Sequence, residues 1–135
     1  MRYLALVPAV LLAGCGVSTT YADRDDRPPP PSERADRMLA GKVAGAPRDC
    51  LGPRESDRMT IDRGQVLFRV NRNLVYRNTM NGCSTLRDGD VLQTNLYGTG
   101  RLCRGDIAQI IDRASGTGRG ACSFGEFVPY SSAAR

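Results

Sequence analysis

The chain contains no histidine and no tryptophan among its 135 residues. Without histidine it cannot carry out Ser-His-Asp or Cys-His catalysis, and it has no imidazole with which to bind a metal ion. A chain of this length holds one domain, with no second lobe to enclose a substrate. We therefore expect a protein that is not an enzyme, with no catalytic residue, no cofactor and no bound metal.

Long apolar segments are also missing. The run Leu4–Ala13 has about ten mostly apolar residues, about half the length that a membrane-spanning helix needs. It follows Arg2 and the terminal amino group, which is the arrangement of a signal peptide. A buried N-terminal helix is the alternative, and Pro8 disfavours it because proline interrupts the helix interior.

The apolar run ends in Leu12-Ala13-Gly14-Cys15. These residues resemble the bacterial lipobox, which implies cleavage between Gly14 and Cys15 and attachment of acyl chains such as palmitate to Cys15. Two or more acyl chains anchor a protein stably where one does not. Gly16 follows, and the absence of aspartate there implies, by the sorting pattern of these lipoproteins, the outer membrane with the domain facing the periplasm. A plain secretory signal with a chance cysteine is the alternative.

Arginine supplies nearly all of the positive charge, with 18 arginines and a single lysine. The net charge is +5 for the whole chain, and twelve arginines against nine acidic residues leave +3 in residues 48–130. This excess is compatible with an anionic membrane surface and far below that of a nucleic-acid-binding protein. We therefore expect a membrane partner through the lipid anchor, and no nucleic acid.

Composition divides the chain into a signal peptide (1–14), a flexible lipid-anchored tether (15–47), a disulfide-bonded β domain (48–130) and a tail (131–135). Pro28–Pro31 favours an extended polyproline conformation, and the tether has too little apolar surface to fold, which predicts disorder. Within it, Ser32–Ala40 is either a short helix with Ser32 as N-cap and Gly41 as its end, or more tether.

Short alternating runs separated by turn residues predict a mainly β fold, a small antiparallel sheet or barrel of five to six strands. Val66, Phe68 and Val70 share one face of a strand that the turn Asn71–Asn73 connects to its partner. The expected strands are Met59–Ile61, Gln65–Val70, Leu74–Arg77, Val91–Tyr97, Ile107–Ile111 and Ala121–Phe127.

Four cysteines remain after Cys15, and an even number in a small exported domain predicts two disulfides. They are Cys50, Cys83, Cys103 and Cys122. The close C-x-x-C pairs typical of zinc sites are absent. Of the three connectivities we favour Cys50–Cys83 with Cys103–Cys122, because each pair lies within one local unit. A hairpin closing at Ser115–Gly116 would place Cys122 opposite Ala108, so the second bridge also needs a turn at Arg104–Gly105.

Several segments together resemble a family of small exported bacterial proteins known only as a domain of unknown function. The segments are Val75–Met80, Gly82-Cys83, Leu102–Ile107 and Ala121–Pro129, which carry an L-C-x-G-D motif and a closing C-x-x-G-x-F-x-P pattern. The resemblance covers about Cys50 to Pro129. It implies a mostly β domain with two disulfides, and it implies no activity.

Three short motifs each have two interpretations, one as a chemical site and one as a turn or loop. Asp106 after Gly105 favours a turn cap over a functional carboxylate. Asp88 and Asp90 flank Gly89 without the remaining ligands of a calcium loop, which also favours a turn. The stretch 116–120 is glycine-rich but lacks a following Gly-Lys-Ser/Thr, so we interpret it as a hairpin loop.

The candidate binding surface is a group of arginines on one side of the sheet, suited to lipid phosphates or to another anionic envelope polymer. They are Arg69, Arg72, Arg77, Arg101 and Arg104, and a merely solvated surface is the alternative. The expected function is a non-enzymatic binding or structural role as an envelope lipoprotein, with an anionic envelope component or an envelope protein as partner. The alternatives are a secreted inhibitor of a target enzyme and a small hydrolase that uses two carboxylates.

Overall fold

The computed structural model describes residues 31–62, 64–96 and 98–133. The predicted signal peptide, Gly14, Cys15 and the tether up to residue 30 lie outside the described residues. The two helices, α1 (Pro31–Leu39) and α2 (Pro53–Ser56), are short. Within the described ranges no helix has the length and apolar character needed to cross a membrane.

The fold is mainly β, with antiparallel sheets and two disulfides, as predicted. The described residues form ten short strands where five or six were expected: β1 (Lys42–Ala44), β2 (Cys50–Leu51), β3 (Met59–Asp62), β4 (Gln65–Arg69), β5 (Leu74–Thr79), β6 (Val91–Thr94), β7 (Leu102–Cys103), β8 (Ile107–Ile111), β9 (Gly118–Ser123) and β10 (Phe127–Ser132). They form a five-stranded sheet in the order β1-β10-β5-β4-β3, a three-stranded sheet β6-β8-β9 and the pair β2-β7.

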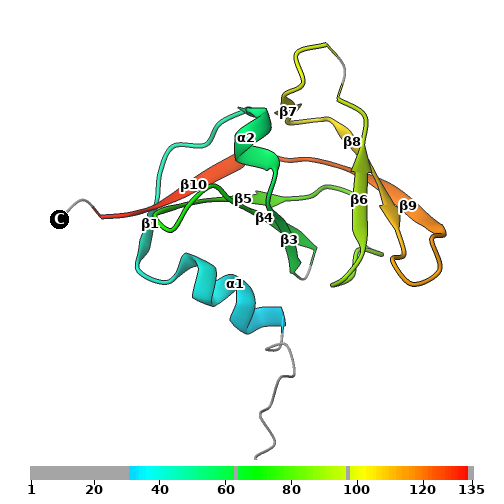
Figure 1. The fold of residues 1–135 in the computed structure, drawn as a ribbon, viewed down its shortest axis with the longest axis horizontal. Coiled ribbons are helices and arrows are strands. Elements are labelled where there is room, and N and C mark those ends of the chain that lie inside the picture. Colours follow the sequence, from blue (N-terminus) through cyan, green and yellow to red (C-terminus); the bar gives the residue numbers. More distant parts are fainter. Residues whose placement is uncertain (1–30, 63, 97, 134–135) are drawn as a thin grey trace, which may run out of the picture.

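The β4–β5 hairpin is confirmed, and its two faces pack against different parts of the molecule. Arg69 pairs with Val75 at the end of the hairpin, and the Asn71 side chain accepts hydrogen bonds from the backbone N–H groups of the turn. Val66 and Phe68 pack in the main core, whereas Leu67 packs on the opposite face. In Figure 1, α1 lies below this sheet and α2 lies above it.

The main core lies between the five-stranded and the three-stranded sheets. Its centre is a cluster of three aromatic rings, Phe68, Phe124 and Phe127, with centroids 5.8–6.2 Å apart. Phe124 follows β9 and Phe127 begins β10, so the chain crosses between the two sheets at this cluster (Figure 1). The aromatic cluster therefore joins the sheets into one core.

The fold extends beyond the expected domain of residues 48–130 at both ends. For the segment 32–40 the sequence leaves a helix and a tether as alternatives. Its residues 32–39 lie in α1, which begins one residue before the predicted N-cap Ser32 and ends at Leu39. Its Ala35 is buried against Leu67 and Val75. Strand β1 pairs with β10 up to Ser132. The stretch 31–44 folds because it covers an apolar face and an open edge of the sheet.

Two predicted strands are shorter or differently divided in the structure. The run Ala121–Phe127 is not one strand, because β9 ends at Ser123 and β10 begins at Phe127 in a different sheet. The run Val91–Tyr97 pairs only over β6, which ends at Thr94. In both segments the alternation of apolar residues identifies a β region, and the pairing partners decide its length.

The predicted disulfide pairing is wrong. The bridges are Cys50–Cys103 and Cys83–Cys122, with Cα separations of 4.0 and 5.2 Å. Cys122 lies opposite Ala108, as the predicted hairpin register requires, and it meets Cys83 beside the bridge between Asn81 and Ser123. Cys50 and Cys103 are direct partners in the β2–β7 pair. Both bridges join segments that are distant in sequence. The predicted pairing instead joined cysteines that share one local unit of the chain.

Candidate functional site

A hollow of about 460 Å³ lies between α1 and the β4–β5 hairpin. Five cationic side chains line it, and we call this group the basic pocket: Arg34, Arg37, Lys42, Arg69 and Arg72. Met38, Thr60, Asn71 and Val75 complete the lining. A concave site with this charge is suited to an anionic group, because guanidinium groups donate forked hydrogen bonds to phosphate and carboxylate oxygens.

The position of α1 brings the cations of the helix to those of the sheet. Its two arginines lie one turn apart, while Arg69 ends β4 and Arg72 lies in the following turn. The helix is held by Ala35, whose backbone N–H donates to the Asp62 carboxylate at 3.2 Å. Asp62 is buried, with 1% exposed. This contact and the packing of Ala35 on the sheet fix the arginine-bearing face of α1 over the hairpin.

No carboxylate of residues 31–62, 64–96 or 98–133 forms an ion pair with a member of the basic pocket. The ion pairs in which both partners belong to these ranges are made by Arg48, Arg104 and Arg119. Arg37 donates from Nε to the carbonyl oxygen of Glu33 at 3.0 Å, which satisfies one of its five donors. The pocket thus gathers positive charge that the surrounding carboxylates leave unpaired.

The predicted arginine surface is divided in the structure. Arg69 and Arg72 lie in the basic pocket. Arg101 lies in the loop before β7 and does not line this pocket. Arg77 and Arg104 line a different hollow of about 270 Å³. There Arg104 pairs with Glu126 at 2.8 Å, and the Arg77 guanidinium lies 5.1 Å from the centroid of the Tyr130 ring.

Sequence reasoning missed Arg34, Arg37 and Lys42. They lie in the segment that was assigned to the tether, before the expected domain boundary. The i,i+3 spacing of the two arginines, which puts both on one helix face, is the signal that could have found them. The sequence does not indicate which surface this helix covers, so the spacing alone does not assign the two arginines to a site.

Arg48, Glu55 and Tyr76 form a second polar cluster. Glu55 accepts hydrogen bonds from Arg48 (3.0 Å), from the Tyr76 hydroxyl (3.1 Å) and from the Gly52 N–H (2.8 Å). Burial raises the pKa of Glu55, but these hydrogen bonds outweigh it and the net shift is downward. Burial raises the pKa of Tyr76. At neutral pH the cluster is therefore an ionised carboxylate held by a cation and a neutral phenol, which suits a structural contact.

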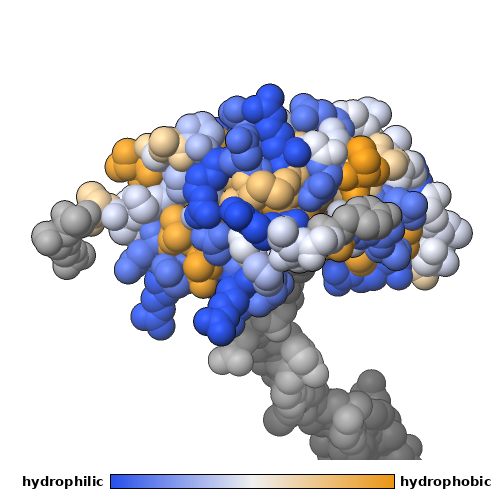
Figure 2. All heavy atoms as spheres, turned by 90° about the horizontal axis from the view of Figure 1, so that it is seen from above, coloured by the Kyte–Doolittle hydropathy of each residue, from blue (hydrophilic) through white to orange (hydrophobic). Residues whose placement is uncertain are grey.

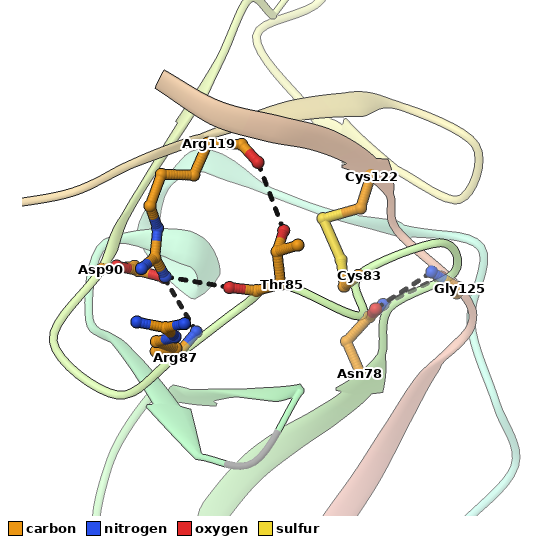
Figure 3. Close-up of a disulfide and its surroundings, with 8 residues drawn as sticks. All are labelled: Asn78, Cys83, Thr85, Arg87, Asp90, Arg119, Cys122 and Gly125. Atoms are coloured by element: carbon orange, nitrogen blue, oxygen red, sulfur yellow. Dashed lines mark hydrogen bonds and ion pairs between the residues drawn. A yellow bond between two sulfur atoms is a disulfide. The ribbon is translucent and has the colours of Figure 1, made fainter. Parts of the chain in front are cut away.

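The loop between β5 and β6 is fixed by an ion pair, shown in Figure 3. Arg119 binds Asp90 at 2.6 Å and also donates to the Thr85 carbonyl oxygen at 2.9 Å. The same carboxylate accepts from the Arg87 N–H at 2.8 Å. These contacts occupy Asp90 and confirm the interpretation of residues 88–90 as a turn.

The interpretation of Asp106 is also confirmed, whereas that of residues 116–120 is only partly right. Asp106 accepts a hydrogen bond from the Cys103 N–H at 2.7 Å and so closes the turn that contains Gly105. Of the stretch 116–120, Gly116 and Thr117 belong to the hairpin loop, in which Asp112 accepts hydrogen bonds from Ala114 and Ser115. Residues 118–120 are not loop, because they begin β9 and pair with β8. In the described part of the chain no three Cys, Asp or Glu residues are grouped so that they could hold a metal ion.

The face that carries α2 differs from the basic pocket in character. Figure 2 shows hydrophilic side chains around a small apolar patch in the middle of this face, and further separate apolar patches toward both sides. Exposed apolar areas that mark protein interfaces are larger and contiguous. The basic pocket on the α1 side is therefore the better-defined binding feature. Comparison of the chain with family models, curated proteins and solved structures finds no match.

Proposed function

We propose that this protein is an envelope lipoprotein, anchored in the outer membrane through Cys15, whose β domain binds an anionic component of the envelope without catalysing a reaction. The observation that carries the proposal is the basic pocket, in which five cations meet with no ion-paired carboxylate among the described residues. Cleavage after Gly14 and acylation of Cys15 rest on the lipobox resemblance. The domain faces the periplasm in this proposal.

The charge arrangement supports binding more than catalysis. A hollow lined by cations attracts anions and fixes their orientation through forked hydrogen bonds. It offers no histidine, cysteine thiolate or carboxylate that could act as a base or a nucleophile, because its lining consists of arginine, lysine, threonine, asparagine, methionine and valine. The ligand class that this lining recognises carries phosphate or carboxylate groups.

The test uses the mature chain, residues 15–135 with Cys15→Ser, on a phosphocellulose column. The double variant Arg34→Gln/Arg69→Gln removes two pocket charges, and Arg101→Gln/Arg113→Gln removes two exposed charges elsewhere. Because the two variants have the same net charge, a general charge effect changes both equally. The proposal expects the pocket variant to elute at clearly lower salt than the control variant. Equal elution of both variants would contradict it.

A further inference from the structure

We propose that the ligand of the basic pocket is the phosphate of anionic membrane lipids, so that the domain binds the same leaflet that holds its anchor. This inference rests on the proposed function and names the ligand class of that site. It follows from the number of residues that separate Cys15 from the pocket, from the composition of the pocket walls and from the accessibility of its cations.

The first observation is the connection between anchor and pocket. Helix α1, which carries Arg34 and Arg37, begins at Pro31, 16 residues after Cys15. Sixteen residues span at most about 55 Å when fully extended. The start of α1, the helix that forms one wall of the pocket, therefore stays within that distance of the leaflet surface in an anchored molecule. A second contact made under such a restraint is intramolecular, with an effective lipid concentration in the millimolar range.

The second observation is the composition of the pocket walls. The cations come from opposite sides of the hollow, from α1 and from the β4–β5 hairpin, so a phosphate between them can receive guanidinium donors from two directions. Met38, which is half-buried, supplies apolar surface to the hollow, and Val75 beneath it is buried with 2% exposed. A lipid headgroup presents a phosphodiester next to a glycerol and acyl region, and this combination matches a cationic rim beside apolar side chains.

The third observation is the accessibility of the cations. Arg37, Arg69 and Arg72 are exposed and Arg34 is half-buried, so their guanidinium groups can reach a surface. Each cation close to an anionic membrane strengthens binding about fivefold, and salt weakens the effect. Several such cations on one side of the domain produce measurable attachment to vesicles even without the acyl chains.

A soluble phosphorylated compound would present the same chemistry to the pocket, and the experiment separates the two sources. The mature chain with Cys15→Ser is floated with vesicles of phosphatidylcholine, with and without phosphatidylglycerol as about one third of the lipid. Inorganic pyrophosphate is titrated calorimetrically as the free phosphate probe. The variants are Arg34→Gln/Arg69→Gln and the control Arg101→Gln/Arg113→Gln, and the thermal unfolding of each is recorded to show that it is folded.

The proposal expects flotation with phosphatidylglycerol vesicles and not with neutral ones. The pocket variant then loses about tenfold or more in vesicle affinity, while the control variant loses little. Binding of pyrophosphate without flotation would overturn the lipid inference and leave the proposed function standing. Equal flotation of the two variants, or flotation with neutral vesicles, would also overturn it. If neither vesicles nor pyrophosphate bind, both the inference and the proposed function are wrong.

Discussion

Asn78 and Gly125 exchange two hydrogen bonds in the core of the molecule. The Asn78 side chain donates to the Gly125 carbonyl oxygen at 2.8 Å and accepts from its N–H at 3.0 Å (Figure 3). Gly125 lies in the short link between β9 and β10, where the chain passes from one sheet to the other. Asn78 thus satisfies the backbone groups that this link removes from both sheets.

The first prediction concerns Gly125→Ala. A Cβ atom built on Gly125 collides with the carbonyl oxygen of Thr79, which belongs to β5 and cannot move away as a flexible side chain would. We expect a loss of about 1–3 kcal/mol in the free energy of unfolding, as for other overpacked sites. The measurement is urea denaturation. The control is Gly118→Ala, where a Cβ meets no atom within 4 Å, and this variant should remain near the stability of the original protein.

The second prediction concerns the disulfide connectivity. Each cysteine lies in a different tryptic peptide: residues 49–54, 78–87, 102–104 and 120–135. Digestion of the denatured, non-reduced protein after alkylation should give peptide 49–54 linked to 102–104, and 78–87 linked to 120–135. A link between 49–54 and 78–87 would contradict the structure. Replacing Cys83 and Cys122 by alanine should cost about 4 kcal/mol, because this bridge closes a loop of 39 residues.

The third prediction concerns the acid side of the stability curve. The pKa of Glu55 is lower in the folded protein than its ordinary value, so the ionised group stabilises the fold above its unfolded pKa. That contribution is lost as the pH falls from about 4 through the folded pKa. As the pH falls through this range, the free energy of unfolding of the original protein should therefore decrease more steeply than that of Glu55→Gln. The measurement is urea denaturation across the acid range, and equal slopes for the original protein and Glu55→Gln would contradict the prediction.

The sequence was sufficient for the local β structure. Alternation of apolar residues identified the β4–β5 hairpin and its faces, and the turn at Ser115–Gly116 placed Cys122 opposite Ala108. Both features depend on residues close in the chain, where strand period and turn chemistry determine the register.

The disulfide pairing and most of the candidate site depend on distant contacts. Cys50 meets Cys103 only because β2 pairs with β7. Arg34 joins Arg69 only because Ala35 packs on Leu67 and Val75. The local pattern of residues 31–44, short and rich in charge, does not reveal these partners. Tertiary packing decides whether such a segment folds.

The fourth prediction concerns the membrane anchor. Expressed at full length in a bacterium with two membranes, the protein should incorporate labelled palmitate, and Cys15→Ser should abolish the label. A label that persists in Cys15→Ser would contradict lipidation at this residue. Gly16→Asp is the matched variant, because the lipobox sorting pattern predicts that it keeps the label and moves the protein to the inner membrane fraction.

A nitrogen-15 NMR titration of the mature Cys15→Ser chain with inorganic pyrophosphate tests whether the basic pocket is the binding site. The account predicts that the shifted backbone and arginine side-chain signals belong to the pocket residues, with the largest changes at Arg34, Arg37, Arg69 and Arg72. Changes centred on Arg77 and Arg104, or no changes at all, would contradict it.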